Sequence, residues 1–130
     1  MHTYSHDYAK VYASVDAYFQ DLDQIGQLVK EEIGYVPCFI RFPGGSSNTI
    51  SASYTKGIMT TLTQEVQARG YQYYDWNGSS GDGAVRTTEQ LVDQATSFHD
   101  NNIITPTNFS HHWCEFFRIA ICQIKITHSP

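Results

Sequence analysis

The chain has 130 residues, of which 41% are hydrophobic and 16% are charged, a balance typical of a folded protein rather than a disordered one. This length allows one domain at most. The net charge of -5 and the scattered basic residues argue against a nucleic-acid partner, which needs clustered lysine and arginine. We expect no membrane segment, because no apolar run is long enough to span a membrane, and the sequence shows no signal peptide. The three cysteines form no disulfide framework and do not decide the compartment.

The first predicted element is an amphipathic helix from Ser14 to Ile33. Ser14 is a suitable N-cap, and Asp16 lies in the first turn, where a negative charge is favourable. Apolar side chains recur three and four residues apart, at Val15, Tyr18, Leu22, Ile25 and Val29. Gly34 follows at the position where a left-handed residue often ends a helix.

The second predicted element is a short buried strand over Val36–Phe42, where apolar and aromatic residues lie between glycines. Pro43–Asn48 follows as a loop rich in glycine and serine. A second helix is predicted from about Ser53 to Arg69, with apolar residues on one face. The strand Tyr71–Trp76 comes directly after it.

The remaining elements continue this alternation. Asn77–Gly83 is a polar loop, and Thr87-Thr88-Glu89-Gln90 has the spacing of a capping box that opens a third helix, to about His99. Asn102–Thr105 begins a third strand. Strands recur about every 30 residues, the size of a βαβ unit, which predicts parallel strands in a sheet or in part of a barrel. Sites in such folds lie on loops after the strands, which are here Pro43–Asn48 and Asn77–Gly83.

The segment from Pro106 to Pro130 breaks the alternation, because it has apolar residues but no clean period, no caps and no glycine. Within it, Phe116–Ile126 fits a helix or a strand equally well. We therefore divide the chain into a domain over residues 1–105 and an irregular tail over 106–130.

Two imidazoles stand four residues apart in His2-Thr3-Tyr4-Ser5-His6. On a helical turn they would share one face and could reach one ion. Neutral imidazole suits Zn²⁺ and other borderline divalent metals, although a complete site needs a third ligand, usually a carboxylate. Because this spacing is common, two solvated histidines on a frayed terminus remain the alternative.

Three segments, in this order and separated by helices of suitable length, carry a family resemblance. They are His2–His6, Arg41-Phe42-Pro43-Gly44-Gly45, and the segment Asp75–Gly83. They resemble the H-[ST]-x-x-H metal motif, the R-x-P motif and the D-S-x-D-W groove loop of the polysaccharide deacetylase family, also called NodB-like or carbohydrate esterase family 4. Together they cover roughly residues 1–105.

The resemblance implies an α/β fold, a partial distorted (β/α) barrel of NodB type with parallel strands. It implies a metal-dependent hydrolase that removes N-acetyl groups from N-acetylglucosamine-containing glycans such as peptidoglycan or chitin. The implied cofactor is a divalent metal, Zn²⁺ first, with Co²⁺ or Mn²⁺ as alternatives. The implied partner is a glycan substrate, and the implied location is extracellular or at the cell envelope.

The resemblance also assigns roles to single residues. His2 and His6 become metal ligands, Arg41 orients the base carboxylate, and Asp82 orients the catalytic histidine. The candidates to line the sugar groove are Tyr4, Pro43, Gly44 and Trp76. The residues alone leave an alternative open for three of these assignments. Arg41 would then form an ordinary salt bridge at a strand end, Asp82 would be a turn residue beside a glycine, and Trp76 would belong to the core.

The chain also departs from the family pattern. The Asp-Asp motif that supplies the base and the third metal ligand has no match before His2. Ser79 and Gly83 stand where the groove loop usually has Asp and Trp. The last motif, an apolar strand that ends in a catalytic histidine, is unmatched, because Thr105-Pro106 follows Ile103-Ile104 and neither His111 nor His112 fits it.

We therefore expect a chain truncated at its N-terminus, with impaired deacetylase activity. The alternative is a noncatalytic remnant that binds carbohydrate or metal without turnover. A barrel without its first strand exposes sheet edges and apolar surface, so possible self-association is expected as well.

Overall fold

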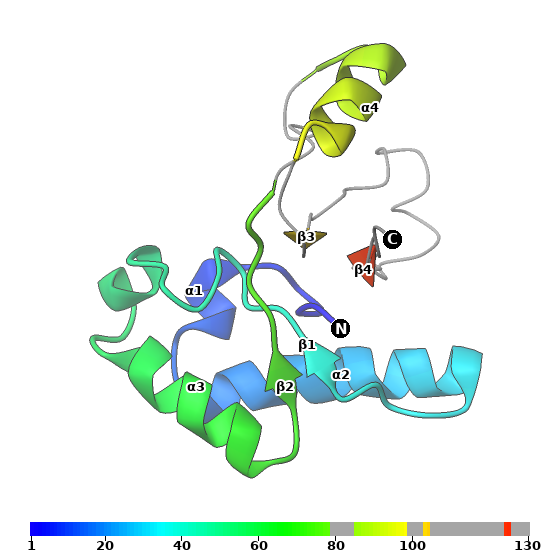
Figure 1. The fold of residues 1–130 in the computed structure, drawn as a ribbon. Coiled ribbons are helices and arrows are strands. Elements are labelled where there is room, and N and C mark those ends of the chain that lie inside the picture. The colour runs from blue at the N-terminus through cyan, green and yellow to red at the C-terminus, as the bar shows by residue number, and fades with distance from the viewer. Residues whose placement is uncertain (79–84, 99–102, 105–123, 126–130) are drawn as a thin grey trace. The chain divides into compact units, whose positions relative to one another are not determined.

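The computed structural model describes residues 1–78, 85–98, 103–104 and 124–125. The chain divides into two compact units, Met1–Asp75 and Trp76–Pro130. The first unit contains helices α1, α2 and α3 and the short strands β1 and β2 (Figure 1). The histidine pair and the loop after β1 therefore belong to one unit, in which their geometry is defined.

Helix α2, Val15–Ile33, confirms the first predicted helix and both of its caps. The Ser14 hydroxyl accepts a hydrogen bond from the Ala17 N–H at 3.0 Å, and Gly34 ends the helix with a φ of 86°. The buried residues form the expected stripe: Tyr18, Phe19, Asp21, Leu22, Ile25, Gly26 and Val29. Asp21 is the one charged residue in this stripe, and the periodicity of the sequence did not single it out.

Strands β1, Phe39–Ile40, and β2, Gln72–Tyr73, pair in parallel, with Phe39 opposite Gln72 and Ile40 opposite Tyr73. This confirms the parallel pairing predicted for the first two strands. The prediction of a buried strand over Val36–Phe42 is wrong in its extent and burial. The strand covers only Phe39–Ile40, and Phe39 is 51% exposed while Ile40 is 2% exposed. An apolar run alone does not tell a strand buried on one face from a strand buried on both.

The N-terminus lies along the other edge of β1. The Arg41 N–H donates to the Met1 carbonyl at 2.9 Å, and the Met1 amino group donates to the Phe39 carbonyl. The carbonyls of Cys38 and Ile40 point the opposite way and accept bonds from the β2 side. Met1 therefore runs parallel to β1 on the side away from β2, which brings His2 to the end of β1.

The second predicted helix begins later than expected. A 3₁₀ helix, η1, covers Ile50–Ser53, and α3 covers Ile58–Ala68 after a turn. The turn residues Tyr54–Gly57 interrupt the helix that the apolar periodicity extended back to Ser53. Its predicted apolar face is confirmed, with these residues buried: Ile58, Met59, Leu62 and Val66.

The core of the first unit joins α1, Tyr8–Val11, with α2, α3 and the end of β1. Phe42 is fully buried, and its ring lies 5.4 Å from the ring of Tyr18 and 5.3 Å from that of Tyr73. These aromatic contacts connect the long helix to both strands. The loop that follows Phe42 is thus fixed at its start by the core.

In the second unit, α4, Thr88–Thr96, confirms the predicted capping box between Thr87 and Gln90. Strand β3, Ile103–Ile104, lies where a strand was predicted, but it pairs antiparallel with β4, Ile124–Lys125. The predicted third parallel strand is therefore wrong in its pairing. The apolar tail, whose sequence left helix and strand open, supplies the partner strand, and hydrophobic pattern does not fix which strand pairs with which.

The described residues show helices with a short parallel sheet, and barrel closure stays a prediction. The predicted boundary between residues 105 and 106 lies outside the described residues. Across the described parts of the chain, no helix combines the length and apolar character needed to cross a membrane. Large apolar side chains are exposed at the end of α2 and along β1: Ile33, Tyr35, Val36 and Phe39. Self-association through such surface stays a prediction.

Candidate metal and substrate site

His2 and His6 come together through a bend in the chain. Their ring centroids are 4.9 Å apart, with 58° between the ring planes. The expected helical turn is wrong, because α1 begins only after Asp7, whose carboxylate accepts the Ala9 N–H at 3.0 Å as its N-cap. His6 instead has a φ of 51°, a left-handed conformation in which histidine is enriched among non-glycine residues. The metal role predicted for the pair stays a prediction.

The His2 imidazole is oriented by the backbone of β1. Its Nδ1 lies 2.8 Å from the Arg41 carbonyl oxygen. A carbonyl oxygen only accepts, so Nδ1 carries the proton and Nε2 keeps its lone pair for another partner. Burial lowers the pKa of His2 to about 4, against a smaller raising effect of the hydrogen bond to the Arg41 carbonyl. His2 is therefore neutral near pH 7, the form that binds metals.

The loop after β1, Pro43–Asn48, is held by buried polar contacts. The Tyr12 hydroxyl donates to the Pro43 carbonyl at 2.6 Å, and Asn48 Nδ2 donates to the Gly45 carbonyl at 2.7 Å. Burial raises the pKa of Tyr12, so its hydroxyl remains a neutral donor. These bonds fix the backbone of the segment that the sequence assigned to the sugar groove.

Gly44 lies where this loop approaches the aromatic residues of α1. Its φ is 74°, and a Cβ at this position would lie 3.0 Å from the Tyr8 hydroxyl oxygen and 3.1 Å from Asn48 Cβ. The Tyr8 ring in turn lies 6.0 Å from the His6 ring and 5.5 Å from the Tyr12 ring. Gly44 and the histidine pair are thus connected through Tyr8.

We predict that Gly44→Ala destabilises the first unit more than Gly34→Ala does. Both residues have positive φ, but no atom lies within 4 Å of a Cβ built at Gly34. Gly34→Ala should therefore cost only the conformational strain, about 1 kcal/mol. Gly44→Ala should cost about 2–3 kcal/mol, because the methyl group also displaces Tyr8 and Asn48. Urea unfolding of both variants measures this difference, and equal losses would contradict it.

Asp75 joins the end of β2 to the loop after β1. Its Oδ1 accepts the Ser46 N–H at 2.8 Å, and its Oδ2 accepts a hydrogen bond from the Ser46 hydroxyl. The sequence placed Asp75 in the groove motif but gave it no role of its own. A carboxylate just past the end of one parallel strand, together with a polar loop after the neighbouring strand, is the signal that would have found it.

The other predicted site residues are placed as follows. The Arg41 backbone is hydrogen-bonded to His2 and Met1, and Arg41 is half-buried. Pro43 is buried and Gly44 is exposed. Trp76 begins the second unit with its side chain 38% exposed, so a pure core role is wrong for it. Asp82 lies outside the described residues, and its predicted role stays a prediction.

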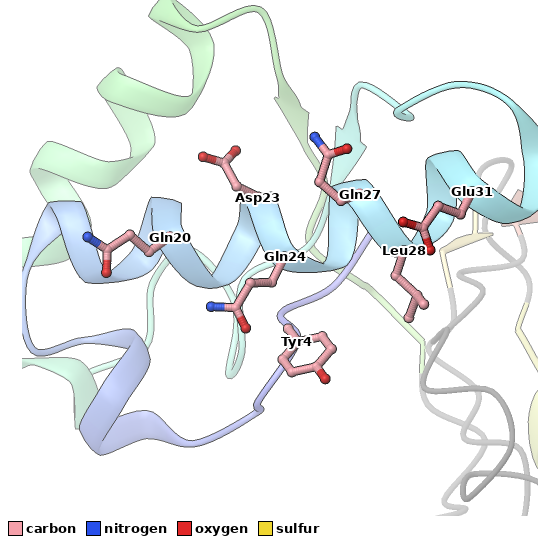
Figure 2. Close-up of a pocket in the computed structure, with 7 residues that line it drawn as sticks. All are labelled: Tyr4, Gln20, Asp23, Gln24, Gln27, Leu28 and Glu31. Carbon is pink, nitrogen blue, oxygen red and sulfur yellow. The ribbon is translucent and has the colours of Figure 1, made fainter.

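Tyr4 lies at the rim of a shallow, open depression of about 710 Å³ along α2. Figure 2 shows Gln24 and Leu28 projecting from α2 on the side where the Tyr4 ring lies. The lining is mostly amide and carboxylate: Gln20, Asp23, Gln24, Gln27 and Glu31, with Leu28 and Tyr4. Tyr4 is thus accessible beside polar groups, and its predicted contact with a sugar stays a prediction.

The residues around His2 and His6 fit part of a divalent metal site. The two imidazole rings are neighbours. His2 is neutral, its Nδ1 carries the proton, and the lone pair on its Nε2 is available to a metal ion. Thr3, which lies between the two histidines in the sequence, has a buried hydroxyl without a hydrogen-bond partner in the described part of the chain. No group of three His, Cys, Asp or Glu side chains that could hold a metal exists among the described residues. The pair would therefore offer two ligands to such an ion, and its metal role stays a prediction.

The fold is similar to that of a deacetylase catalytic domain, a hydrolase that acts on a glycan. The particular structure is the crystal structure of the catalytic domain of a peptidoglycan N-acetylglucosamine deacetylase from Eubacterium rectale ATCC 33656. The two chains are 47% identical with a TM-score of 0.70, and the match covers 75% of this chain. This similarity confirms the resemblance to the polysaccharide deacetylase family that the motifs predicted.

The match covers 45% of the length of that deacetylase domain, so this chain spans less than half of it. A scan against protein-family models finds no match for the chain, and neither does a search of curated proteins. The activity and substrate of that longer domain are therefore matters of proposal for this chain.

Proposed function

We propose that this chain carries part of the active site of a metal-dependent N-deacetylase, with His2 and His6 as two ligands of a divalent ion. Zn²⁺ is the first choice, and Co²⁺ and Mn²⁺ are the alternatives. The observation that carries the proposal is the 2.8 Å contact between His2 Nδ1 and the Arg41 carbonyl. Metal-binding histidines in proteins donate their second ring nitrogen in this way, which fixes the tautomer that binds.

The proposed substrate is a glycan that contains N-acetylglucosamine, such as peptidoglycan or chitin. The similar crystal structure is described as a peptidoglycan N-acetylglucosamine deacetylase, and its identity of 47% to this chain supports a related substrate class. The reaction is hydrolysis of the acetamide, in which water adds to the carbonyl and the C–N bond breaks to give acetate and an amine. A glycan of this kind also favours an extracellular or cell-envelope location.

Each residue has a defined task in this proposal. His2 and His6 hold the ion, and the chemistry that it supplies when bound is activation of water and polarisation of the acetyl carbonyl. The Arg41 backbone orients His2, and the Arg41 side chain is assigned the task of orienting a base carboxylate. Tyr4, Pro43, Gly44 and Trp76 are assigned to the glycan groove, and Asp82 to the orientation of a catalytic histidine.

Turnover by this chain alone is proposed to be weak. The chain spans 45% of the similar deacetylase domain, and its described residues bring no third ligand to the histidine pair. Loss of a general base lowers a hydrolysis rate by about 100-fold to 10,000-fold. The second candidate function, a noncatalytic carbohydrate- or metal-binding module, is favoured by this same incomplete donor set.

Calorimetric titration of the full chain with ZnCl₂ and CoCl₂ tests the proposal. His2→Ala and His6→Ala should each weaken binding by more than the roughly 10–100-fold that loss of a group orienting a ligand costs, because each removes a ligand itself. A His111→Ala/His112→Ala double variant is the matched control, and it should leave binding unchanged. Binding that survives both single substitutions would overturn the proposed site, and so would binding that disappears only in the control.

Acetate release from N-acetylglucosamine oligomers, followed on the same samples, separates the two candidate functions. Slow, metal-stimulated release that His2→Ala abolishes would support the deacetylase. Tight metal or glycan binding with no acetate at all would favour the noncatalytic module.

A further inference from the structure

A charged side chain interrupts the apolar face of α2. Asp21 is 8% exposed and follows Tyr18 and Phe19 in the buried stripe of the helix. Burial of a carboxylate costs free energy unless hydrogen bonds or opposite charges compensate it. The groups that contact Asp21 therefore indicate its role.

The Asp21 carboxylate contacts the segment from His2 to His6, which we call the histidine turn. Oδ2 of Asp21 accepts the Tyr4 N–H at 2.5 Å, and Oδ1 accepts the Ser5 N–H at 3.1 Å. Oδ2 also lies 3.3 Å from the Ser5 nitrogen. Tyr4 and Ser5 lie between His2 and His6 in the chain, so one carboxylate binds two successive peptide N–H groups in the middle of the motif. Charge-assisted bonds of this kind are shorter and stronger than neutral ones.

The turn is fixed on both sides of this point. On one side, His2 is bonded to the Arg41 carbonyl on β1. On the other side, the Asp7 N–H donates to the Ser5 hydroxyl at 3.3 Å, and Asp7 begins α1. His6, with its left-handed φ of 51°, stands between Ser5 and Asp7. Its position therefore depends on how Ser5 is held.

We propose that Asp21 is a positioning residue, which holds the turn so that the two imidazoles face a common ion. This inference rests on the proposed metal role of His2 and His6. Asp21 is not a ligand itself, because both of its oxygens are directed at backbone N–H groups. Its effect passes through the backbone of Tyr4 and Ser5 to the rings on either side.

The test compares Asp21→Asn with Asp23→Asn in the full chain. Asp23 is an exposed carboxylate on the same helix, two residues away, and it matches the change in charge. An asparagine at position 21 turns an amide N–H₂ toward one of the backbone donors and loses that bond. Asp21→Asn should weaken Co²⁺ and Zn²⁺ binding by about 10–100-fold, the range for groups that orient metal ligands. It should also change the visible absorption spectrum of bound Co²⁺, whereas Asp23→Asn should do neither.

A second control separates positioning from stability. Ser14→Ala removes the N-cap of α2 and destabilises the same helix without touching the turn. It should leave metal affinity and the Co²⁺ spectrum unchanged. Amide hydrogen exchange should show that Tyr4 and Ser5 lose protection in Asp21→Asn alone. If Asp21→Asn does not fold, the pair Asp21→Glu and Asp23→Glu decides, and only the first should shift the Co²⁺ spectrum.

The possible failures are distinguishable. If the unmodified chain binds no metal through His2 and His6, the proposed function and the inference fall together. If it does bind but Asp21→Asn binds equally well, the inference alone is wrong. A loss of affinity in Asp21→Asn that Ser14→Ala reproduces would also overturn it, because stability would then explain the effect.

Discussion

Phe42→Ala should lower the free energy of unfolding of the first unit by about 3–5 kcal/mol, the range for removing a large aromatic side chain from a core. Phe42 is fully buried between Tyr18 of α2 and Tyr73 of β2, with ring centroids 5.4 Å and 5.3 Å away. The alanine leaves a cavity where helix and strands meet. A domain typically has only about 5–15 kcal/mol of stability, so this loss would remove a large fraction of it.

Phe39→Ala is the matched control for this prediction. Phe39 is the same residue type three positions earlier, but it is 51% exposed, and its ring contacts only that of Tyr74 among the described aromatic pairs, at 5.7 Å. Its loss should cost about 1 kcal/mol or less. Because the chain has two units, hydrogen exchange of the α2 amides is the suitable measurement, since it reports on the first unit alone. Similar losses of protection in the two variants would contradict the packing of Phe42 between α2 and β2.

The sequence predicted the local elements of the first unit well, because their signals are local. The Ser14 cap, the apolar stripe and Gly34 define α2, and the spacing around Thr87 defines the capping box of α4. The pairing of the strands is harder to predict from the sequence. The parallel pair of β1 and β2 followed from the alternation of helix and strand, but the antiparallel partner of β3 lies in a segment without a clear period.

The candidate site was predicted in part for the same reason. His2, His6 and Arg41 belong to short motifs and could be named from the chain. Asp21 and Asp75 could not, because their roles depend on hydrogen bonds to residues 16 or more positions away in the sequence. Neither spacing nor hydrophobic period records such bonds, and only the folded backbone brings their donors within reach.

Hydrogen bonds to distant elements, and not a helical turn, bring the two histidines close together. A helical turn would have placed them on one face by its own geometry. Instead, β1 holds His2 and α2 holds the turn before His6, so two distant elements determine the separation of the rings. The local geometry of the pair is therefore a property of the whole first unit.

The first unit should also lose stability as the pH falls from about 6.5 to about 4. The pKa of His2 is about 4 in the folded state and 6.5 in the unfolded reference, chiefly because burial disfavours the charged imidazolium. Between these values the unfolded chain binds a proton that the folded chain does not, so acid favours unfolding. The full effect corresponds to about 3 kcal/mol as an upper bound, because the ring is only partly shielded from water.

His2→Asn isolates this contribution, since an asparagine N–H can still donate to the Arg41 carbonyl but has no proton to gain in this range. In the presence of a chelator, the variant should lose about 2 kcal/mol less than the unmodified chain between pH 7 and pH 5. Phe39→Ala is the control, because it should shift the whole stability curve without changing its slope with pH. Urea unfolding at a series of pH values measures all three. Parallel curves for His2→Asn and the unmodified chain would mean that His2 is protonated equally in both states, and that its burial against β1 is not maintained in solution.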